Sequence, residues 1–151
     1  MIEDMYNFLS LSDKLLTGGM PTSDQLKSAA EAGVETVINL ALFDPQSDLA
    51  NEGELVKSLG MEYINIPVDW DSPLRQNLEE FMKAMHAREQ NKLLVHCRAN
   101  YRVSAFIALY RILQLEWEPQ AAFKDLRRIW NPDEYPVWRR FIEESLEAEN
   151  K

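Results

Sequence analysis

Short apolar runs alternate with longer amphipathic stretches over most of this chain. Glycine, proline or aspartate residues bound the apolar runs, a pattern that is typical of buried strands. These runs predict strands at residues 15–19, 34–42, 63–67 and 92–96. Elsewhere, apolar residues recur at helical spacing, which predicts helices at about residues 23–33, 49–60, 74–85, 104–113, 120–130 and 137–149. Ser23 is the expected cap of the first helix, and Gly33 is its expected end.

The order of these elements predicts an α/β fold. Strands alternate with helices in the first part of the chain, and only helices follow the last strand. Such alternation favours a mainly parallel central sheet of about four to five strands, flanked by helices on both faces. Because the chain has no internal repeat and no linker rich in glycine or serine, residues 1–151 are expected to form a single domain. In this architecture, ligands bind at the carboxyl ends of the strands.

Composition and charge narrow the classes of partner. The chain is 46% hydrophobic and 27% charged, as in ordinary globular proteins. Its formal net charge of −9 argues against binding to nucleic acid or to acidic membranes, since both require a basic surface. No apolar run approaches the roughly 20 residues that span a bilayer, and the acidic start is unlike a secretory signal. We therefore expect neither a nucleic-acid nor a membrane partner.

Cys97 is the only cysteine, and it follows the apolar run at 92–96 directly. A near-continuous apolar segment begins at Ser104, so the pattern predicts a buried strand, a short loop and a buried helix. A cysteine facing the amino end of a helix favours a thiolate, and the same position favours an oxyanion bound by backbone amides. One cysteine excludes an internal disulfide, and a reducing cytoplasm is the expected setting for a thiolate nucleophile. The alternative interpretation of Cys97 is a small buried hydrophobe.

Charged and polar side chains surround Cys97 in the sequence. Arg102 can present a planar fork of donors to phosphate oxygens, and we expect it, rather than Arg98, to clamp the anion. The Ser104 hydroxyl is expected to help stabilise the thiolate. His96 is expected to orient the loop, and a structural, half-buried histidine is the equally weighted alternative. Together these residues indicate phosphate-ester chemistry through a cysteine nucleophile, with no metal and no other cofactor.

The segment from His96 to Ser104 resembles the active-site loop of the cysteine-dependent protein tyrosine and dual-specificity phosphatase superfamily. The stretches at residues 9–21 and 32–40 resemble a bacterial tyrosine-phosphatase-like branch, and the whole resemblance spans about residues 9–113. It implies a dual-specificity-phosphatase-like fold and a phosphomonoester hydrolase that acts through a cysteinyl-phosphate on a phosphorylated protein or small molecule. The phosphate-binding loop that it implies consists of Cys97, Arg98, Ala99, Asn100, Tyr101, Arg102, Val103 and Ser104.

Two positions depart from the pattern of this superfamily. Four residues separate Cys97 from Arg102, whereas the superfamily has its arginine one position later, where this chain has Val103. Asn100 replaces the usual glycine, and asparagine is the other residue that best tolerates positive φ. The shorter spacing also occurs in rhodanese-type sulfurtransferases, in which Cys97 would carry a persulfide. A rhodanese-like sulfurtransferase and a non-catalytic phosphate- or phosphoprotein-binding module are therefore the alternative functions.

The resemblance also implies a general acid on a loop that follows an earlier strand. Asp69 and Asp71 are the candidates, because the loop after residue 67 ends at the same sheet edge as Cys97 in the predicted fold. The spacing from Asp69 to Pro73 matches the family better, so Asp69 ranks first. The alternative is that both aspartates cap the helix that follows, a role for which Asp71 and Ser72 are well suited.

Overall fold

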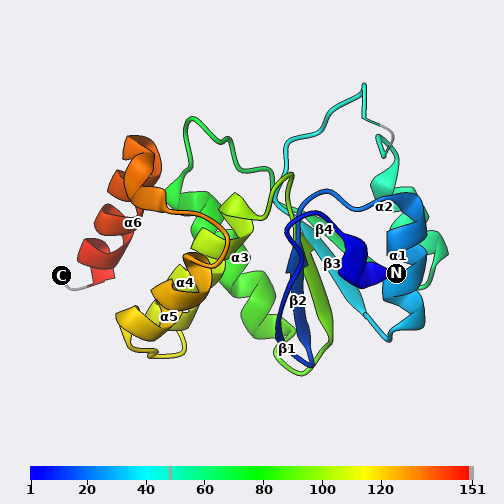
Figure 1. Cartoon of the computed structure of the whole chain (residues 1–151), viewed down its shortest axis with the longest axis horizontal. Coiled ribbons are helices and arrows are strands. Elements are labelled where there is room, and N and C mark those ends of the chain that lie inside the picture. The colour runs from blue at the N-terminus through cyan, green and yellow to red at the C-terminus, as the bar shows by residue number, and fades with distance from the viewer. Residues whose placement is uncertain (48, 150–151) are drawn as a thin grey trace.

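A five-stranded sheet separates two layers of helices in the computed structural model, which describes residues 1–47 and 49–149. In Figure 1, one side of the sheet carries α1 (Ser23–Glu31) and α2 (Glu52–Ser58). The other side carries α3 (Arg75–Ala87), α4 (Tyr101–Leu113), α5 (Pro119–Leu126) and α6 (Pro136–Glu149). Short 3-10 helices lie at Ile2–Asp4 and Pro132–Glu134. The expected α/β class is confirmed.

The sheet is mainly parallel, as the sequence predicts. Its strands are β1 (Leu9–Ser12), β2 (Leu15–Gly18), β3 (Thr36–Asn39), β4 (Glu62–Asn65) and β5 (Leu93–His96), in the order β1-β2-β5-β3-β4. The strand pairs β2–β5, β5–β3 and β3–β4 are parallel, whereas β1 pairs antiparallel with β2. The sequence did not predict β1, because this edge strand alternates half-buried leucines with exposed serines and contains no apolar run.

The two central strands, β3 and β5, are buried on both faces, which explains their nearly continuous apolar sequence. Successive side chains of a strand point to opposite faces of the sheet. Val37 and Leu94 accordingly join the core beneath α1 and α2, whereas Ile38 and Val95 join the larger core beneath the other helices. The strand that leads to Cys97 is therefore held from both sides.

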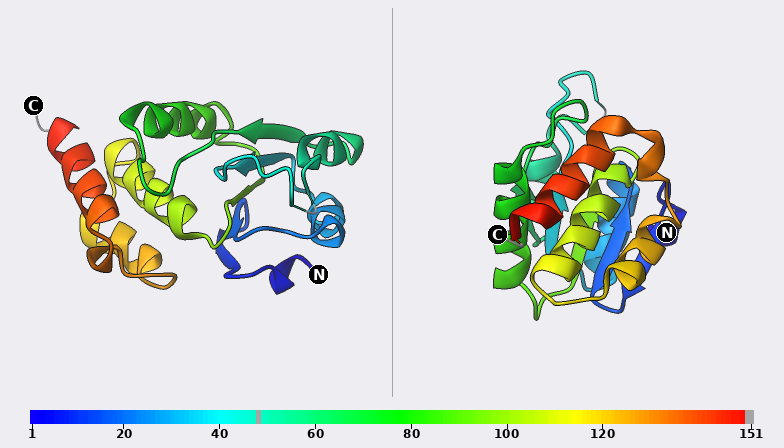
Figure 2. Two further views of the ribbon diagram at one scale, coloured as in Figure 1. Left: turned by 90° about the horizontal axis from the view of Figure 1, so that it is seen from above. Right: turned by 90° about the vertical axis from the view of Figure 1, so that its left-hand side faces the viewer.

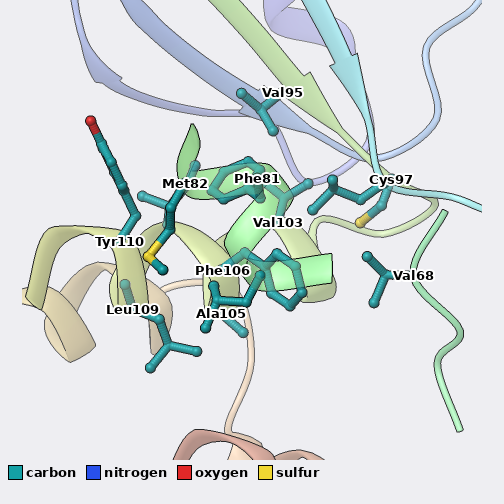
Figure 3. Packing of buried hydrophobic residues seen from close by; sticks show 14 of the residues in the cluster. Val68, Phe81, Met82, Val95, Cys97, Val103, Ala105, Phe106, Leu109 and Tyr110 are labelled. Carbon is teal, nitrogen blue, oxygen red and sulfur yellow. The ribbon is translucent and has the colours of Figure 1, made fainter. Parts of the chain in front are cut away.

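Helix α4 runs through the larger core and is buried over most of its length. It packs against α3, α5, α6 and the sheet, and Figure 2 shows these helices gathered on one side of the strands. Figure 3 shows Phe106 and Val103 of α4 packed among Phe81 of α3 and Val95 of β5. This surrounding explains the apolar sequence all around α4, and it fixes the start of the helix next to Cys97.

The first helix begins one residue earlier than predicted. Thr22, not Ser23, caps α1: its hydroxyl accepts a hydrogen bond from Gln25 N–H at 3.1 Å, and the Gln25 side chain accepts one from Thr22 N–H at 2.9 Å. This reciprocal pair satisfies two donors at once, which a serine one position later cannot do. The predicted end is confirmed, since Gly33 has a φ of 91°.

The helices that follow β3 and β4 also begin differently from the prediction. Helix α2 starts at Glu52, after turns that occupy the residues expected to form its first turn. At the start of α3, neither Asp71 nor Ser72 forms a cap, so the capping alternative for these residues is wrong. Asn77 acts there instead, because its Oδ1 accepts a hydrogen bond from Leu74 N–H at 3.1 Å.

The carboxyl ends of the parallel strands meet at one edge of the sheet. Gly18, His96 and Asn39 lie in register on three adjacent strands, and Asn65 pairs with Asn39 on the fourth. The chain segments that follow β4 and β5 therefore leave the sheet at the same edge, as predicted. None of the helices in the described part of the chain is both long enough and apolar enough to cross a bilayer.

Candidate active site

Cys97 lies at the end of β5, in the middle of this edge. Its N–H donates to the Gly18 carbonyl at 3.4 Å, which extends the ladder between β2 and β5 by one residue. The side chain is 1% exposed and its thiol is free. Figure 3 shows Cys97 at one margin of the larger core, with Val68 and Val103 nearby. Apolar side chains thus cover part of the thiol, and the residue also lines a pocket.

The loop after Cys97 is anchored through its carbonyl groups. The Arg98 carbonyl accepts a hydrogen bond from Met20 N–H at 3.0 Å, and the Ala99 carbonyl accepts one from the Asn7 side chain at 2.9 Å. In a trans peptide the C=O and the N–H point in opposite directions. These anchors therefore turn the N–H groups that follow away from the N-terminal segment.

Gly19 allows the N-terminal segment to approach the loop this closely. A Cβ at Gly19 would lie 2.5 Å from the Arg98 carbonyl oxygen and 3.1 Å from the Tyr6 carbonyl oxygen. The Gly19 N–H also donates to that Tyr6 carbonyl at 2.7 Å. The sequence indicated only a turn at this position, because close approach to a loop far along the chain leaves no local signal.

Asn100 adopts the left-handed conformation, with a φ of 67°, as its replacement of glycine predicts. It is fully buried, and its side-chain N–H group donates to the Asn7 carbonyl at 2.9 Å and to the Thr17 hydroxyl at 3.0 Å. The Oδ1 atom of the same amide is buried and accepts no hydrogen bond from the described residues, so Asn100 makes no side-chain cap for α4. The first N–H groups of a helix have no partner within it, so this uncapped end is suited to an anion.

Arg102 lies in the first turn of α4 and is only 6% exposed. Its Nη1 donates to the Val68 carbonyl at 2.7 Å, and the side chain lines the pocket over Cys97. A guanidinium has five N–H donors, so this bond leaves others for a ligand. The structure therefore brings the expected clamp, the cysteine and the loop after β4 together.

Arg98 points in a different direction from Arg102. It is half-exposed and pairs with the Asp44 carboxylate at 3.2 Å, although part of it also lines the pocket. Hydrogen bonds from the Gln46 N–H and from the Arg98 guanidinium hold the pKa of Asp44 below its ordinary value of 3.8. The outward direction expected for Arg98 is observed, with a surface ion pair as its cause.

Two residues of the predicted phosphate loop turn their side chains away from the pocket. Val103 is fully buried in the larger core. The Ser104 hydroxyl donates to the Tyr101 carbonyl at 3.1 Å and accepts a hydrogen bond from the Trp130 indole at 2.9 Å. The hydroxyl expected to support the thiolate is therefore engaged with the wall of the core instead.

A pocket of about 360 Å³ opens over Cys97. Three of its walls are aromatic, and its lining consists of Trp70, Cys97, Arg98, Ala99, Tyr101, Arg102 and Tyr135. Trp70 touches both tyrosine rings, at centroid distances of 5.9 and 5.4 Å. The Trp138 indole fixes it further by donating to the Trp70 carbonyl at 2.8 Å. The sequence showed these aromatic residues, but their convergence from four segments had no local signal.

The two candidate acids lie beside this pocket. Asp69 and Asp71 are both exposed, and neither is among the residues that line it. The Asp69 Oδ1 accepts a hydrogen bond from Asp71 N–H at 2.9 Å. The residues on either side of Asp69 do reach the site, because the Val68 carbonyl binds Arg102 and the Trp70 ring forms a wall.

His96 is completely buried, rather than half-buried, and its partner was not predicted. Its Nε2 lies 2.6 Å from Oε2 of Glu52, which is 4% exposed, and its Nδ1 lies 3.2 Å from the Cys97 carbonyl oxygen. Burial raises the pKa of the nearby Tyr63, and the charge of Glu52 adds to that effect. An isolated acidic residue at the start of a surface helix gave no sign of this role, because it resembles ordinary helix-dipole chemistry.

Comparisons with known proteins identify the family. The family model described as "DSP-PTPase phosphatase fused to NAD+ Kinase" matches residues 3–133. The crystal structure of a DUF442 protein from Shewanella putrefaciens CN-32 is 34% identical in sequence, and the match covers 98% of this chain and 96% of that one. The TM-score of this pair is 0.87.

Curated relatives are more distant and longer. The dual specificity protein phosphatase TpbA of Pseudomonas aeruginosa is 24% identical over 129 residues, which are 84% of this chain and 56% of TpbA. A beta-lactamase hydrolase-like protein of Xylella fastidiosa is 24% identical over 111 residues, which are 70% of this chain and 25% of that protein. This chain thus spans between a quarter and about half of the length of these relatives.

The fold is shared more widely. A crystal structure of TpbA in complex with pTyr is 18% identical, with a TM-score of 0.72, and the match covers 90% of this chain and 82% of that one. The family model covers most of the chain and the Shewanella protein matches nearly all of it. This chain therefore belongs to the DSP-PTPase family, a family of cysteine-dependent phosphatases.

Proposed function

We propose that this chain hydrolyses phosphate monoesters through a phosphate group carried on Cys97. In the first step the thiolate attacks phosphorus, the bond from phosphorus to the ester oxygen breaks, and that oxygen takes a proton from an acid. In the second step water attacks the same phosphorus and gives a proton back to the deprotonated acid, the bond to sulfur breaks to return the thiolate, and inorganic phosphate leaves. Neither step requires a metal or another cofactor, and a reducing compartment such as the cytoplasm suits the thiolate.

One observation carries this proposal: Cys97 stands at the mouth of an uncapped, buried helix, at the base of an aromatic-walled pocket. Carbonyl anchors on the intervening loop turn successive N–H groups away from the N-terminal segment. Preorganised N–H donors of this kind stabilise the charge on a transferring phosphoryl group. A cysteine that served only as a core hydrophobe would need neither the anchors nor the pocket.

Arg102 is the proposed clamp for the phosphoryl oxygens. Its bond to the Val68 carbonyl holds the guanidinium at the pocket, so little side-chain freedom remains to be lost when an anion binds. Arg98 is the weaker candidate, because its guanidinium is already committed to Asp44 at the surface.

Asp69 is the proposed acid. The residue before it contacts Arg102 through its carbonyl, and the residue after it, Trp70, forms a wall of the pocket. In this role the Asp69 carboxyl group would turn from the loop toward the leaving oxygen when substrate binds. Asp71 lies two residues further from the contact with Arg102 and is the second choice.

The walls of the pocket favour a particular class of phosphorylated substrate. Trp70, Tyr101 and Tyr135 offer aromatic faces and edges around Cys97. Aromatic pairs in such arrangements are worth about 0.5–1.5 kcal/mol beyond their buried area. We therefore propose an aryl phosphate, such as a phosphotyrosine side chain, over a small alkyl phosphate.

The test compares wild type with Cys97→Ser. Wild type should release phosphate from a chromogenic aryl phosphate, and mass spectrometry after rapid quenching should show a phosphoryl group on Cys97. The variant should lose turnover to the uncatalysed background and still bind inorganic phosphate, measured by calorimetry. Thiocyanate formation from thiosulfate and cyanide would instead support a sulfurtransferase. Phosphate binding by wild type without turnover would support a binding module. Such a module needs no acid in the pocket, and both aspartates are exposed.

A further inference from the structure

The buried pair formed by Glu52 and His96 is not part of the chemistry above. His96 is completely buried and Glu52 nearly so, and they come from two different elements: the last residue of β5 and the first turn of α2. The two ring nitrogens of His96 face two different oxygen atoms. Nε2 lies 2.6 Å from the Glu52 carboxylate, and Nδ1 lies 3.2 Å from the carbonyl of Cys97.

The two contacts of His96 determine how many protons His96 and Glu52 carry together. A carbonyl oxygen is only an acceptor, so the contact with Cys97 is a hydrogen bond when Nδ1 carries a proton. An ionised carboxylate is also only an acceptor, so the contact with Glu52 then requires a proton on Nε2. A neutral histidine next to an ionised Glu52 would keep its one proton on Nε2 and would point a lone pair of Nδ1 at the Cys97 carbonyl. Both contacts are therefore satisfied when the pair holds two protons.

These two protons belong on the imidazole. A protonated Glu52 that donates to a neutral His96 would hold the same two protons, so the two states differ in which group carries the shared one. We assign it to nitrogen, because imidazole is the stronger base in water. The resulting imidazolium and carboxylate cancel each other's charge, which is the condition for burying either of them. The bond from Nδ1 to the Cys97 carbonyl then has an ionised donor, and such bonds are shorter and roughly twice as strong as neutral ones.

This bond acts on the first peptide unit of the anion loop. The Cys97 carbonyl and the Arg98 N–H belong to the same trans peptide and point in opposite directions. Holding the carbonyl against His96 therefore aims the Arg98 N–H away from His96, and Cys97 and Arg98 both line the pocket. The next two carbonyls are held by Met20 and Asn7. Glu52 thus supplies, through His96, the remaining anchor of the loop.

We propose that Glu52 is a positioning residue that keeps His96 protonated on both ring nitrogens and thereby fixes the first N–H donor of the anion loop. The inference rests on the proposed function for its consequence in catalysis. The state of the His96 ring can be measured independently of any activity.

The direct test is nitrogen NMR of protein labelled in its histidine rings. The chain has only two histidines, and His86 is exposed, so a His86→Gln variant assigns the signals. Wild type near neutral pH should show both His96 nitrogens protonated. Glu52→Gln should show one, because the neutral amide can donate to Nε2 while Nδ1 keeps its proton. A His96 ring with only one protonated nitrogen in wild type would overturn the proposal.

A second measurement connects the ring to the loop. In the Cys97→Ser background, Glu52→Gln should weaken the binding of inorganic phosphate by about tenfold, because a charge-assisted bond becomes a neutral one. Glu54→Gln is the matched control, since Glu54 lies on the same helix but is exposed, and it should change binding by less than about twofold. Equal phosphate affinity in the Glu52 and Glu54 variants would also overturn the proposal.

The role of Glu52 can be tested even if the protein is not a phosphatase. A wild-type protein that binds phosphate but does not turn over aryl phosphates would leave both measurements intact. Should Glu52→Gln fail to fold, the wild-type NMR spectrum still decides, because it needs no variant at Glu52.

Discussion

The two loops at the carboxyl edge of the sheet are built in opposite ways. The loop after Cys97 has the fully buried Asn100 at its centre, and this asparagine and the carbonyls of the two residues before it are bonded to residues far away in the sequence. The loop after β4 holds its backbone and Trp70 in place, yet both of its carboxylates, Asp69 and Asp71, are exposed. One loop is fixed by contacts with distant residues, and the other presents its carboxylates to solvent.

A rigid loop suits the binding of phosphate, and a loop with exposed carboxylates suits the transfer of a proton. Preorganised donors lower the barrier only if they need no rearrangement when charge develops, which requires a rigid loop. An acid must reach leaving groups of varied shape and exchange its proton with water between the two steps, which an exposed position permits. We therefore expect changes in the first loop to affect phosphate binding for every substrate, and changes in the second loop to affect substrates according to their leaving groups.

Among variants that keep the Cys97 nucleophile, the largest expected effect comes from Asp69→Asn. General acid catalysis is typically worth about 100-fold to 10,000-fold where the leaving group needs a proton. The variant should therefore slow the hydrolysis of phenyl or alkyl phosphates by that amount. An activated aryl phosphate should be hydrolysed nearly as fast as by wild type, because its leaving group departs as an anion. The measurement is the ratio of the two rates.

Asp71→Asn is the matched control, because it removes a carboxylate from the same loop. If it changes the ratio while Asp69→Asn does not, the acid is Asp71. If neither variant changes the ratio, this loop carries no acid and has no part in proton transfer.

Arg102→Lys is expected to have the next largest effect. An ammonium group is a point charge and cannot reproduce a planar fork that contacts the Val68 carbonyl and an anion together. Loss of one such donor typically costs about 100-fold or more in turnover, and here the loss should be similar for good and poor leaving groups. Arg98→Ala serves as the control. A greater loss of phosphate affinity in Arg98→Ala than in Arg102→Ala would show that the clamp was assigned to the wrong residue.

Local sequence patterns predicted the loop after Cys97 better than they predicted the distant residues that hold it in place. The run at 92–96, the lone Cys97 and the apolar helix after it are neighbours in the sequence, so their arrangement follows from periodicity. The positive φ of Asn100 followed from the tolerance of that residue type. The sequence pattern did not predict the residues that anchor the loop. Asn7, Gly19 and Glu52 contact residues more than 40 positions away, and no local signal marks such contacts.

The fold shows the same division between local and distant determinants. The parallel strands and their order of appearance follow from apolar runs, whereas edge strand β1 is stabilised by pairing with β2 and has no run of its own. Helix starts depend on a few local hydrogen bonds: the cap of α1 is one residue earlier than predicted, and α2 begins at Glu52 instead of about residue 49. For the acid, spacing supplied a ranking of Asp69 over Asp71, and only kinetics can test it.

Substitutions at Asn100 test the rigidity of the first loop and should have a moderate effect on stability. Asn100→Ala loses two hydrogen bonds and also places a Cβ in the left-handed region, at a cost of about 1–2 kcal/mol for the backbone alone. Asn100→Gly loses the same bonds without that cost. Urea unfolding should therefore place the glycine variant about 1–2 kcal/mol above the alanine variant. Equal stability of the two variants would mean that the loop relaxes and is not rigid.

The smallest expected effect is that of Asp44→Asn, which removes the partner of Arg98 at the surface. One fewer negative charge next to the anion loop should tighten phosphate binding in the Cys97→Ser background by no more than about threefold at low salt, because exposed charges interact weakly in water. Added salt should abolish the difference, since screening acts over about 10 Å at 0.1 M.

The pH dependence of this small effect follows from the direction of the Asp44 pKa. Bonds from the Gln46 N–H and from Arg98 hold that pKa below 3.8, so the wild-type carboxylate remains ionised throughout the neutral and mildly acidic range. Measured with sulfate, which stays a dianion while inorganic phosphate itself titrates near neutral pH, the difference between wild type and Asp44→Asn should therefore stay constant from about pH 8 to about pH 5. It should vanish only as the pH falls through the lowered pKa, where the wild-type group takes up a proton. A difference that changes near neutral pH would mean that another titrating group governs Arg98, and that the surface pair does not keep it away from the anion.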